Sequence, residues 1–396
     1  MKKKLLIYGL FIMIFCLFTG CSTAGGYYRS GKKCFLSGNY EEAAANFAAA
    51  IQSNPNRAEY YIDYGMTLIA MDRYDEAIAQ FDRVYMNKDI LMVKRNNKRA
   101  LRGEGIAYYN MQQYEEAIRQ FEEALAIRVL SELDLDILYY KGNALLIMGA
   151  YEEARDTYTR IIETFGNKAE ALGKRAYTCR KTGEYDKSLA DYDMAISIEK
   201  DCYDYYFGKY DLLTAMQDET GAAAVLEQAA AIEAVSKEDR YNQAKIHYYQ
   251  GIFDLALSEL SEGFAQGFPG AYFYIGEIYA KQKDYSTAIY YYEKYIDKGD
   301  ITETAVYNQI AYCYMKQEDY DKALDYLETG IHSGDAAAMK VLKKNSIIAL
   351  EHLGQYDAAQ EKLLEYLESY PEDRQAAREK EFIKTRNIDF LTEAVQ

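Results

Sequence analysis

A four-residue pattern, an aromatic residue followed by two mostly polar residues and an alanine, recurs along most of the 396-residue chain. Clear copies begin at Tyr40, Tyr74, Tyr114, Tyr151, Tyr285, Tyr320 and Tyr356, and variants begin at Tyr185 and Phe253. With Ala222 included, the small residue that closes the pattern stands at positions 43, 77, 117, 154, 188, 222, 256, 288, 323 and 359, at intervals of 32 to 40 residues. A period of this length predicts an array of repeats in which each repeat buries its apolar face against its neighbours.

Each repeat is predicted to contain two helices. Four residues after the small residue stands a large apolar one, such as Phe47, Phe81 or Phe121, and this spacing puts both on one face of a helix. An earlier position is repeatedly glycine: Gly31, Gly65, Gly105, Gly142 and Gly276. Glycine inside a helix costs about 1 kcal/mol relative to alanine, so we expect the first helix to approach the alanine of the second closely there. Gly38, Gly149, Gly183 and Gly354 offer the left-handed backbone that ends the first helix.

These positions resemble those of the tetratricopeptide (TPR) family over nearly all of residues 24–371. The resemblance implies an all-α fold, a right-handed solenoid of about ten helix-turn-helix repeats over residues 27–371. A charged helix over residues 372–396 is expected to cap it, with Ala377, Phe382 and Ile383 covering the last repeat. Tyr210 and Ile347 stand where the family has a small residue, so helix packing is expected to differ there.

The N-terminus is predicted to be a separate element, a signal peptide over residues 1–20. Three lysines precede the apolar run from Leu5 to Phe18, which is typical of a secretory signal. A spanning helix needs about 20 apolar residues, and this disfavours the alternative of an uncleaved anchor. The segment from Phe18 to Cys21 resembles a bacterial lipobox. That resemblance implies a lipoprotein whose Cys21 carries a diacylglycerol and a fatty acid such as palmitate, with residues 21–26 as a short linker and the chain anchored to the extracytoplasmic face of a membrane.

Composition argues against several classes of function. A formal charge of −16 disfavours nucleic-acid binding, which needs a basic surface. The three histidines are far apart and no nucleotide-binding or nucleophile motif occurs. Paired carboxylates such as Glu115 and Glu116 open predicted second helices, where they complement the helix dipole. We therefore expect no metal, no cofactor and no catalysis, and we expect Cys34 and Cys179 to be small core residues.

Tyrosine is the outlier of the composition, with 42 copies and no tryptophan. In the TPR family, several positions of the first helix line a concave groove. Carried over to this sequence, the groove residues are Arg102, Tyr109, Asn110, Tyr139, Asn143, Tyr177, Arg180, Lys181, Tyr241, Lys245 and Tyr248. Tyrosine offers a large amphipathic contact area with few rotatable bonds, and the basic and amide groups can bind a peptide. The alternative is that these aromatic rings pack against one another.

A basic segment interrupts the acidic background between the second and third repeats. Lys88, Lys94, Arg95, Lys98 and Arg99 form it, and it coincides with a six-residue insertion in the repeat. One interpretation is a solvated helix face. The other is a docking site for an acidic partner or for anionic lipid headgroups.

Together these patterns predict a membrane-anchored scaffold that binds a protein or peptide in a tyrosine-rich groove. One alternative is a structural part or assembly factor of an envelope, pilus or secretion machine. A second is glycan or cell-wall binding, which the absence of tryptophan disfavours.

Overall fold

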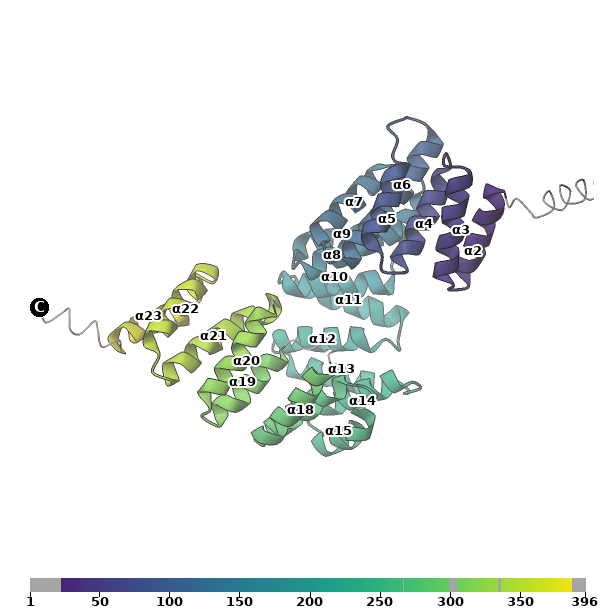
Figure 1. The fold of residues 1–396 in the computed structure, drawn as a ribbon. Coiled ribbons are helices and arrows are strands. Elements are labelled where there is room, and N and C mark those ends of the chain that lie inside the picture. The colour runs from purple at the N-terminus through teal and green to yellow at the C-terminus, as the bar shows by residue number, and fades with distance from the viewer. Residues whose placement is uncertain (1–22, 266, 299–304, 334–335, 387–396) are drawn as a thin grey trace, which may run out of the picture. The chain divides into compact units, whose positions relative to one another are not determined.

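The computed structural model describes residues 23–386 except 266, 299–304 and 334–335, and this part of the chain consists of helices and their connections (Figure 1). The prediction of an all-α repeat fold is confirmed. The predicted signal peptide and Cys21 lie outside the described residues. The chain forms two compact units, residues 1–200 and 201–396, which we call unit 1 and unit 2.

Unit 1 contains five helix pairs, and the first and second helix of a pair are called helix A and helix B. The pairs are α2 (Ala24–Leu36) with α3 (Tyr40–Ser53), α4 (Ala58–Ile69) with α5 (Tyr74–Phe81), α6 (Leu91–Asn110) with α7 (Tyr114–Ala126), α8 (Asp134–Ile147) with α9 (Tyr151–Phe165), and α10 (Ala169–Lys181) with α11 (Tyr185–Ile198). Two short 3₁₀ turns, η1 (Asp82–Val84) and η2 (Ser131–Leu133), lie between pairs.

Unit 2 contains five further pairs. They are α12 (Tyr203–Ala215) with α13 (Glu219–Ala230), α14 (Lys237–Tyr249) with α15 (Phe253–Glu259), α17 (Gly270–Lys281) with α18 (Tyr285–Asp297), α19 (Val306–Lys316) with α20 (Tyr320–His332), and α21 (Ala336–His352) with α22 (Tyr356–Ser369). A short helix, α16 (Glu262–Ala265), precedes α17, and α23 (Arg374–Arg386) follows the last pair.

The glycine of helix A packs against the aromatic ring of helix B. A methyl group added at Gly142 would stand 2.7 Å from Cζ of Tyr158, and Gly31, Gly65, Gly105 and Gly276 face Phe47, Phe81, Phe121 and Tyr292 in the same way. The close approach predicted at the glycines is confirmed, and the atoms nearest to each glycine belong to the aromatic ring and not to the alanine. The ring four residues after the alanine extends back across the pair and fills the space that the missing side chain leaves.

The turns between helix A and helix B use left-handed backbone. Gly38, Gly149, Gly183 and Gly354 have φ between 71° and 82°, as predicted. Other repeats place a non-glycine residue there: Asp72, Gln112, Gln217, Lys283 and Glu318. Each of these turns reverses the chain, so helix B runs antiparallel to helix A in every pair.

Helices A form an inner layer within each unit. In unit 1, α2 contacts α4, α4 contacts α6 and α6 contacts α8, whereas each helix B packs mainly on its own helix A and on the next one. In unit 2, α14 contacts α17 and α19 contacts α21 in the same manner. Because helices A are closer to one another than helices B, the helix A face is the concave one.

Both ends of the predicted solenoid need correction. The first helix begins at Ala24 and is capped by the Thr23 side chain, so Ala24, Gly25 and Gly26 belong to a helix and not to a linker. At the other end, α23 covers the last repeat with Ala376 and Ile383, both buried. Ala377 and Phe382 are exposed, because the face of α23 that meets α22 is set by Ala376 and Ile383, which are seven residues apart.

Candidate protein-binding surfaces

Three of the predicted groove tyrosines lie on consecutive helices A of unit 1. Tyr109 belongs to α6, Tyr139 to α8 and Tyr177 to α10, helices that Figure 1 labels. All three side chains are partly exposed. Burial, with the nearby Glu170 carboxylate adding to it, raises the pKa of Tyr139 to about 12. Burial is also the main cause that raises the pKa of Tyr109. Both phenols therefore stay protonated and can donate a hydrogen bond at any physiological pH.

Tyr109 is held by neighbouring rings. Its ring meets Tyr114 edge-on at 5.6 Å and Tyr140 edge-on at 5.4 Å, measured between ring centroids. Tyr140 in turn stacks on Phe121 in the core at 5.8 Å. The exposed part of Tyr109 is thus a rigid surface, which suits a binding residue because little conformational entropy is lost on contact.

At the end of α10 a tyrosine and two basic side chains lie together. The Arg180 guanidinium and the Lys181 ammonium each lie 5.4 Å from the centroid of the Tyr177 ring. Tyr151 meets Tyr177 edge-on at 6.2 Å. Lys181 is exposed, so this corner presents positive charge beside aromatic surface, a combination that can receive an acidic or aromatic side chain.

Two predicted groove residues are engaged within the fold instead. The Arg102 Nε donates to Asp136 on α8 at 2.5 Å. The Asn143 side-chain oxygen accepts a hydrogen bond of 2.9 Å from the Tyr158 hydroxyl. Asn110, at the end of α6, is exposed. Among the predicted groove residues of unit 1, the exposed polar side chains are therefore Asn110 on α6 and Lys181 on α10.

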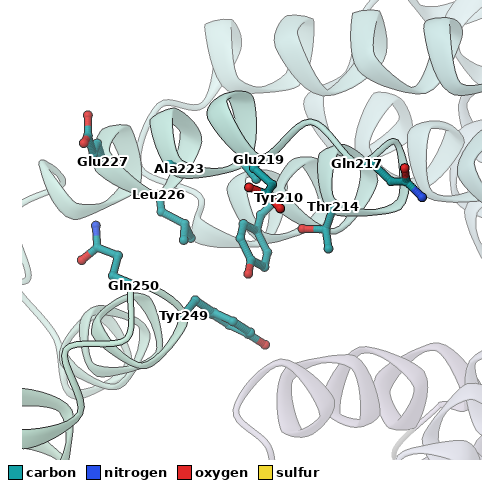
Figure 2. Close-up of a pocket in the computed structure, with 10 residues that line it drawn as sticks. Tyr210, Thr214, Gln217, Glu219, Ala223, Leu226, Glu227, Tyr249 and Gln250 are labelled. Carbon is teal, nitrogen blue, oxygen red and sulfur yellow. The ribbon is translucent and has the colours of Figure 1, made fainter.

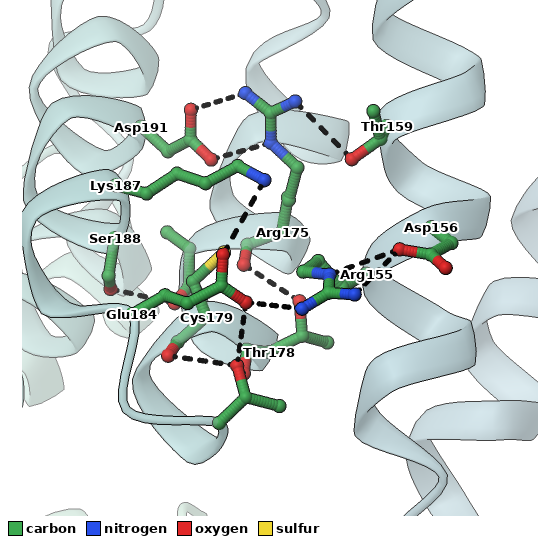
Figure 3. A network of polar contacts seen from close by, with 12 residues as sticks. Arg155, Asp156, Thr159, Arg175, Thr178, Cys179, Glu184, Lys187, Ser188 and Asp191 are labelled. Atoms are coloured by element: carbon green, nitrogen blue, oxygen red, sulfur yellow. Dashed lines mark hydrogen bonds and ion pairs between the residues drawn. The ribbon is translucent and has the colours of Figure 1, made fainter.

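A polar network connects α10, the helix that carries Tyr177, to α9 and α11 (Figure 3). Arg175 of α10 forms a two-pronged ion pair with Asp191 of α11, at 2.6 and 2.7 Å. Arg155 of α9 pairs with Glu184, in the turn before α11. The Ser188 hydroxyl, which replaces the usual alanine, donates to the Ala176 carbonyl at 2.7 Å. The Arg155–Glu184 pair joins the fourth and fifth repeats, and the other two contacts hold α10 against α11.

In unit 2 the predicted groove tyrosines are core residues. Tyr241 and Tyr248 are only 9% and 8% exposed, so the prediction that they offer contact area to a partner is wrong. Phe268 packs on Tyr241 at 4.5 Å and Tyr274 meets Tyr248 edge-on at 5.3 Å. Lys245 lies among rings, 4.4 Å from the Phe207 centroid. The alternative, that aromatic residues pack against one another, holds here.

A pocket that the sequence did not predict lies within unit 2, between α12, α13 and α14 (Figure 2). Its volume is about 610 Å³. The lining residues are Tyr210, Thr214, Gln217, Glu219, Ala222, Ala223, Leu226, Glu227, Tyr249 and Gln250. The rings of Tyr210 and Tyr249 lie 5.0 Å apart and close one side. Two lining residues are glutamates and none is basic, so the pocket suits a basic or aromatic side chain.

The pocket forms where the repeat pattern breaks. Tyr210 occupies the glycine position of α12, and Leu226 occupies the position that holds Phe or Tyr in unit 1. The Leu226 side chain is shorter than the ring of Tyr158 or Phe121, and the small side chains of Ala222 and Ala223 also line the pocket. In the sequence, Tyr210 in place of the small residue indicates altered helix packing at this site, but it does not indicate where a pocket opens.

A smaller pocket of about 280 Å³ lies on unit 1, lined by Lys32, Phe35, Leu36, Phe47, Asp63, Met66 and Arg99. Asp63 accepts a hydrogen bond of 2.6 Å from the Tyr28 hydroxyl and pairs with Arg99 at 3.3 Å. The pocket extends the concave face toward the first repeat.

The predicted basic patch divides into two parts. Lys98 is fully buried; its Nζ donates to the Ile127 carbonyl at 3.0 Å and to Asp134 at 2.5 Å. Arg99 pairs with Asp63. Including Lys98 in a surface patch was wrong, because the charge on Asp134, one repeat further on, compensates its burial. Lys88, Lys94 and Arg95 are exposed.

Within the described residues, no group of three or more His, Cys, Asp or Glu side chains is arranged to hold a metal ion. In the same part of the chain, none of the helices has the length and apolar character to cross a membrane.

Comparison with models of protein families identifies the repeats. Tetratricopeptide-repeat models match residues 35–89, 102–169, 169–202 and 241–300, which together are more than half of the chain. The chain belongs to the tetratricopeptide-repeat family. A coatomer epsilon subunit model matches residues 274–387. TPR proteins are generally non-catalytic, and the TPR fold indicates a protein–protein interaction scaffold.

Individual relatives are distant. A Dictyostelium discoideum protein, DnaJ homolog subfamily C member 7 homolog, is 22% identical over 167 residues, which is 40% of this chain and 31% of the relative. This chain thus matches about a third of that protein's length. Among solved structures, yeast Tom70 aligns with a TM-score of 0.54 at 14% identity, covering 95% of this chain and 92% of that one. A TPR protein from Parabacteroides merdae gives a TM-score of 0.48 at 16% identity, covering 63% and 98%. These likenesses concern the fold alone.

Proposed function

We propose that this TPR chain is a lipid-anchored, extracytoplasmic scaffold that holds a protein or peptide against the helix A face of unit 1. The observation that carries the proposal is the group of partly exposed, rigidly held rings of Tyr109, Tyr139 and Tyr177, with Lys181 exposed at its end. A few residues supply most of the binding energy at protein interfaces, and tyrosine and arginine are enriched among them.

The partner surface favoured by this geometry is an extended segment with acidic and apolar side chains. Lys181 offers an ion pair, Asn110 offers hydrogen bonds to a peptide backbone, and the tyrosines offer ring faces with hydroxyl donors at the edge. The pocket at Tyr210 and Tyr249 offers a second contact point. It favours a basic side chain of the partner, because Glu219 and Glu227 belong to its lining.

Site-specific photo-crosslinking in intact cells tests the proposal. A photoreactive residue is placed at Lys181 for the concave face, at Thr214 for the pocket and at Arg119 as control; all three side chains are exposed, and Arg119 lies on helix B. We expect one protein to be crosslinked from position 181, and from 214 if the pocket contributes, but not from 119. Equal crosslinking from 119, or none from 181, would contradict binding at the helix A face.

Membrane anchoring is tested independently by the Cys21 variant described below. It rests on the apolar run from Leu5 to Phe18 and on the lipobox-like segment that follows.

A further inference from the structure

The insertion between the second and third repeats exposes a cluster of large apolar side chains. Met86, Ile90, Leu91 and Met92 are 51–61% exposed, and they fall within seven residues. Single exposed apolar residues are normal on protein surfaces, whereas clusters mark interaction sites. Elsewhere in the described part of unit 1, exposed large aliphatic residues occur singly or in twos: Leu36, Ile147 with Met148, and Met194 with Ile198.

This cluster projects from the unit. In α4 the helix begins at Ala58, seven residues before Gly65, whereas α6 begins at Leu91, fourteen residues before Gly105. The extra seven residues extend α6 by about 10 Å at 1.5 Å per residue. Leu91 and Met92 form the first turn of this extension, and Met86 and Ile90 precede it (Figure 1).

Basic side chains flank the apolar cluster. Lys88, Lys94 and Arg95 are exposed, and Lys94 pairs with Asp89. Neither Lys88 nor Arg95 forms an ion pair with any described residue. A net positive segment is unusual in a chain whose formal charge is −16, and its charge complements an anionic surface.

The topology brings this segment to the same edge as the start of the first helix. Helices A and B alternate in direction, so the beginnings of helices A and the ends of helices B share one edge of unit 1, and the A–B turns share the other. The α5–α6 connection and the start of α2 at Ala24 therefore lie at one edge (Figure 1). Cys21 stands three residues before Ala24, a separation of at most about 10 Å.

We propose that the segment Met86–Arg95 is a membrane-docking element that inserts Met86, Ile90, Leu91 and Met92 at the interface of an anionic bilayer. It rests on the proposed lipid anchor at Cys21, which would hold this edge next to the membrane. The apolar side chains enter the boundary between headgroups and acyl chains, and Lys88, Lys94 and Arg95 lie at the level of the phosphates. Two contact points, the anchor and the segment, fix the orientation of unit 1 on the surface.

An anionic bilayer explains the segment better than an acidic protein does. The apolar side chains lie on the projecting first turn of α6 and just before it, and the basic side chains flank them. A bilayer has the matching arrangement, with hydrocarbon beneath a layer of phosphates. The predicted anchor at Cys21 also brings a membrane, and no particular protein, to the edge of unit 1 where the segment lies.

The test uses the full chain, carrying an environment-sensitive fluorescent amino acid at Ile90 and, as matched control, at Leu36. Leu36 is an apolar residue that is 83% exposed at the opposite, A–B turn edge. Each protein is reconstituted with phosphatidylcholine vesicles containing or lacking one quarter phosphatidylglycerol, with spin-labelled lipids as quenchers. We expect a blue-shifted, quenched emission from position 90 on the anionic vesicles and an unshifted emission from position 36. Replacing Lys88 and Arg95 by Gln should weaken the docking of position 90 by about 30-fold, since each basic residue near an anionic surface contributes about fivefold.

Four outcomes would overturn the proposal. The emission at position 90 could remain characteristic of an aqueous environment although the chain sediments with the vesicles. That result would support the anchor and contradict the docking element. Equal quenching at positions 36 and 90 would mean adsorption without orientation. A chain that sediments with neither vesicle type and keeps a water-exposed position 90 would contradict both the anchor and the docking element. Shielding of position 90 only when envelope proteins are present would make the occupant an acidic protein.

Discussion

The ring of Phe81 lies against the backbone of Gly65, so closely that a methyl group on Gly65 would stand 2.6 Å from Cε1 and Cζ of the ring. The same ring also fills the space beside Gly103 of the next repeat. One side chain thus joins helix A of its own repeat to helix A of the following one, and this explains why glycine recurs at one register despite its cost in a helix.

Gly65→Ala should destabilise the fold although alanine is the better helix former. The overpacked ring costs typically 1–3 kcal/mol, against a gain of about 1 kcal/mol from helix propensity. Gly25→Ala, in α2, is the matched control because nothing lies within 4 Å of its added methyl group. Hydrogen exchange resolved by repeat should show lost protection in the first three repeats only. Uniform loss across the chain would contradict a repeat-by-repeat stack.

Lys98→Met should cost about 3 kcal/mol of unfolding free energy, because it leaves Asp134 and the Ile127 carbonyl without their buried partner. Lys94→Met on the same helix is the control; its pair with Asp89 is exposed, and such pairs contribute under about 1 kcal/mol. Urea denaturation of both variants measures the difference. Equal effects would mean that Lys98 is not buried.

Stability should fall as the pH rises from about 4.5 to about 7. Burial, reinforced by the carboxylates of Asp82 and Glu123, raises the pKa of Glu104 from 4.5 to about 7. The folded state therefore holds a proton that the unfolded state has released, and the stabilisation present below pH 4.5 is lost as the pH passes 7. The loss is up to about 3 kcal/mol.

Glu104→Gln should reduce this slope in denaturation curves at pH 5, 6 and 7. The slope should not vanish, because burial beside Glu379 also raises the pKa of Glu351 to about 7. Glu123→Gln, at an exposed site, should change the slope far less. An unchanged slope in Glu104→Gln would show that this carboxyl is ionised in the fold.

Cys21→Ser should abolish lipid attachment. In cells fed a palmitate analogue, the wild-type chain should be labelled and fractionate with membranes, whereas the variant should be unlabelled. An unlabelled wild-type chain together with a membrane-bound variant would identify the Leu5–Phe18 segment as an uncleaved anchor.

The spacing of the repeat predicted the fold well because it determines which residues share a helix face. It could not determine how far a side chain extends, so Gly65 was assigned to the alanine and not to the Phe81 ring. The spacing also could not distinguish partly exposed Tyr109 from buried Tyr241, since burial depends on rings such as Phe268 that no repeat position specifies.

The sequence separation of the charges distinguishes those that pair within the fold. Lys98 and Asp134 are 36 residues apart, and Arg102 and Asp136 are 34 apart, close to one repeat. In a stacked array such residues occupy neighbouring positions on adjacent helices A. Opposite charges at one period are therefore expected to pair within the fold, and this would have separated Lys98 and Arg102 from Lys88 and Arg95.

The most direct test of the account is the affinity of the crosslinked partner for a chain with Tyr177→Ala and Lys181→Ala. Both side chains belong to the corner on α10, and Lys181 is exposed, so circular dichroism should remain that of wild type. The control is Tyr185→Ala, an exposed tyrosine on helix B of the same repeat. We predict about a 30-fold loss of affinity by calorimetry for the double variant, which corresponds to about 2 kcal/mol, and no change for the control. A folded double variant that binds with wild-type affinity would contradict binding at the helix A face of unit 1.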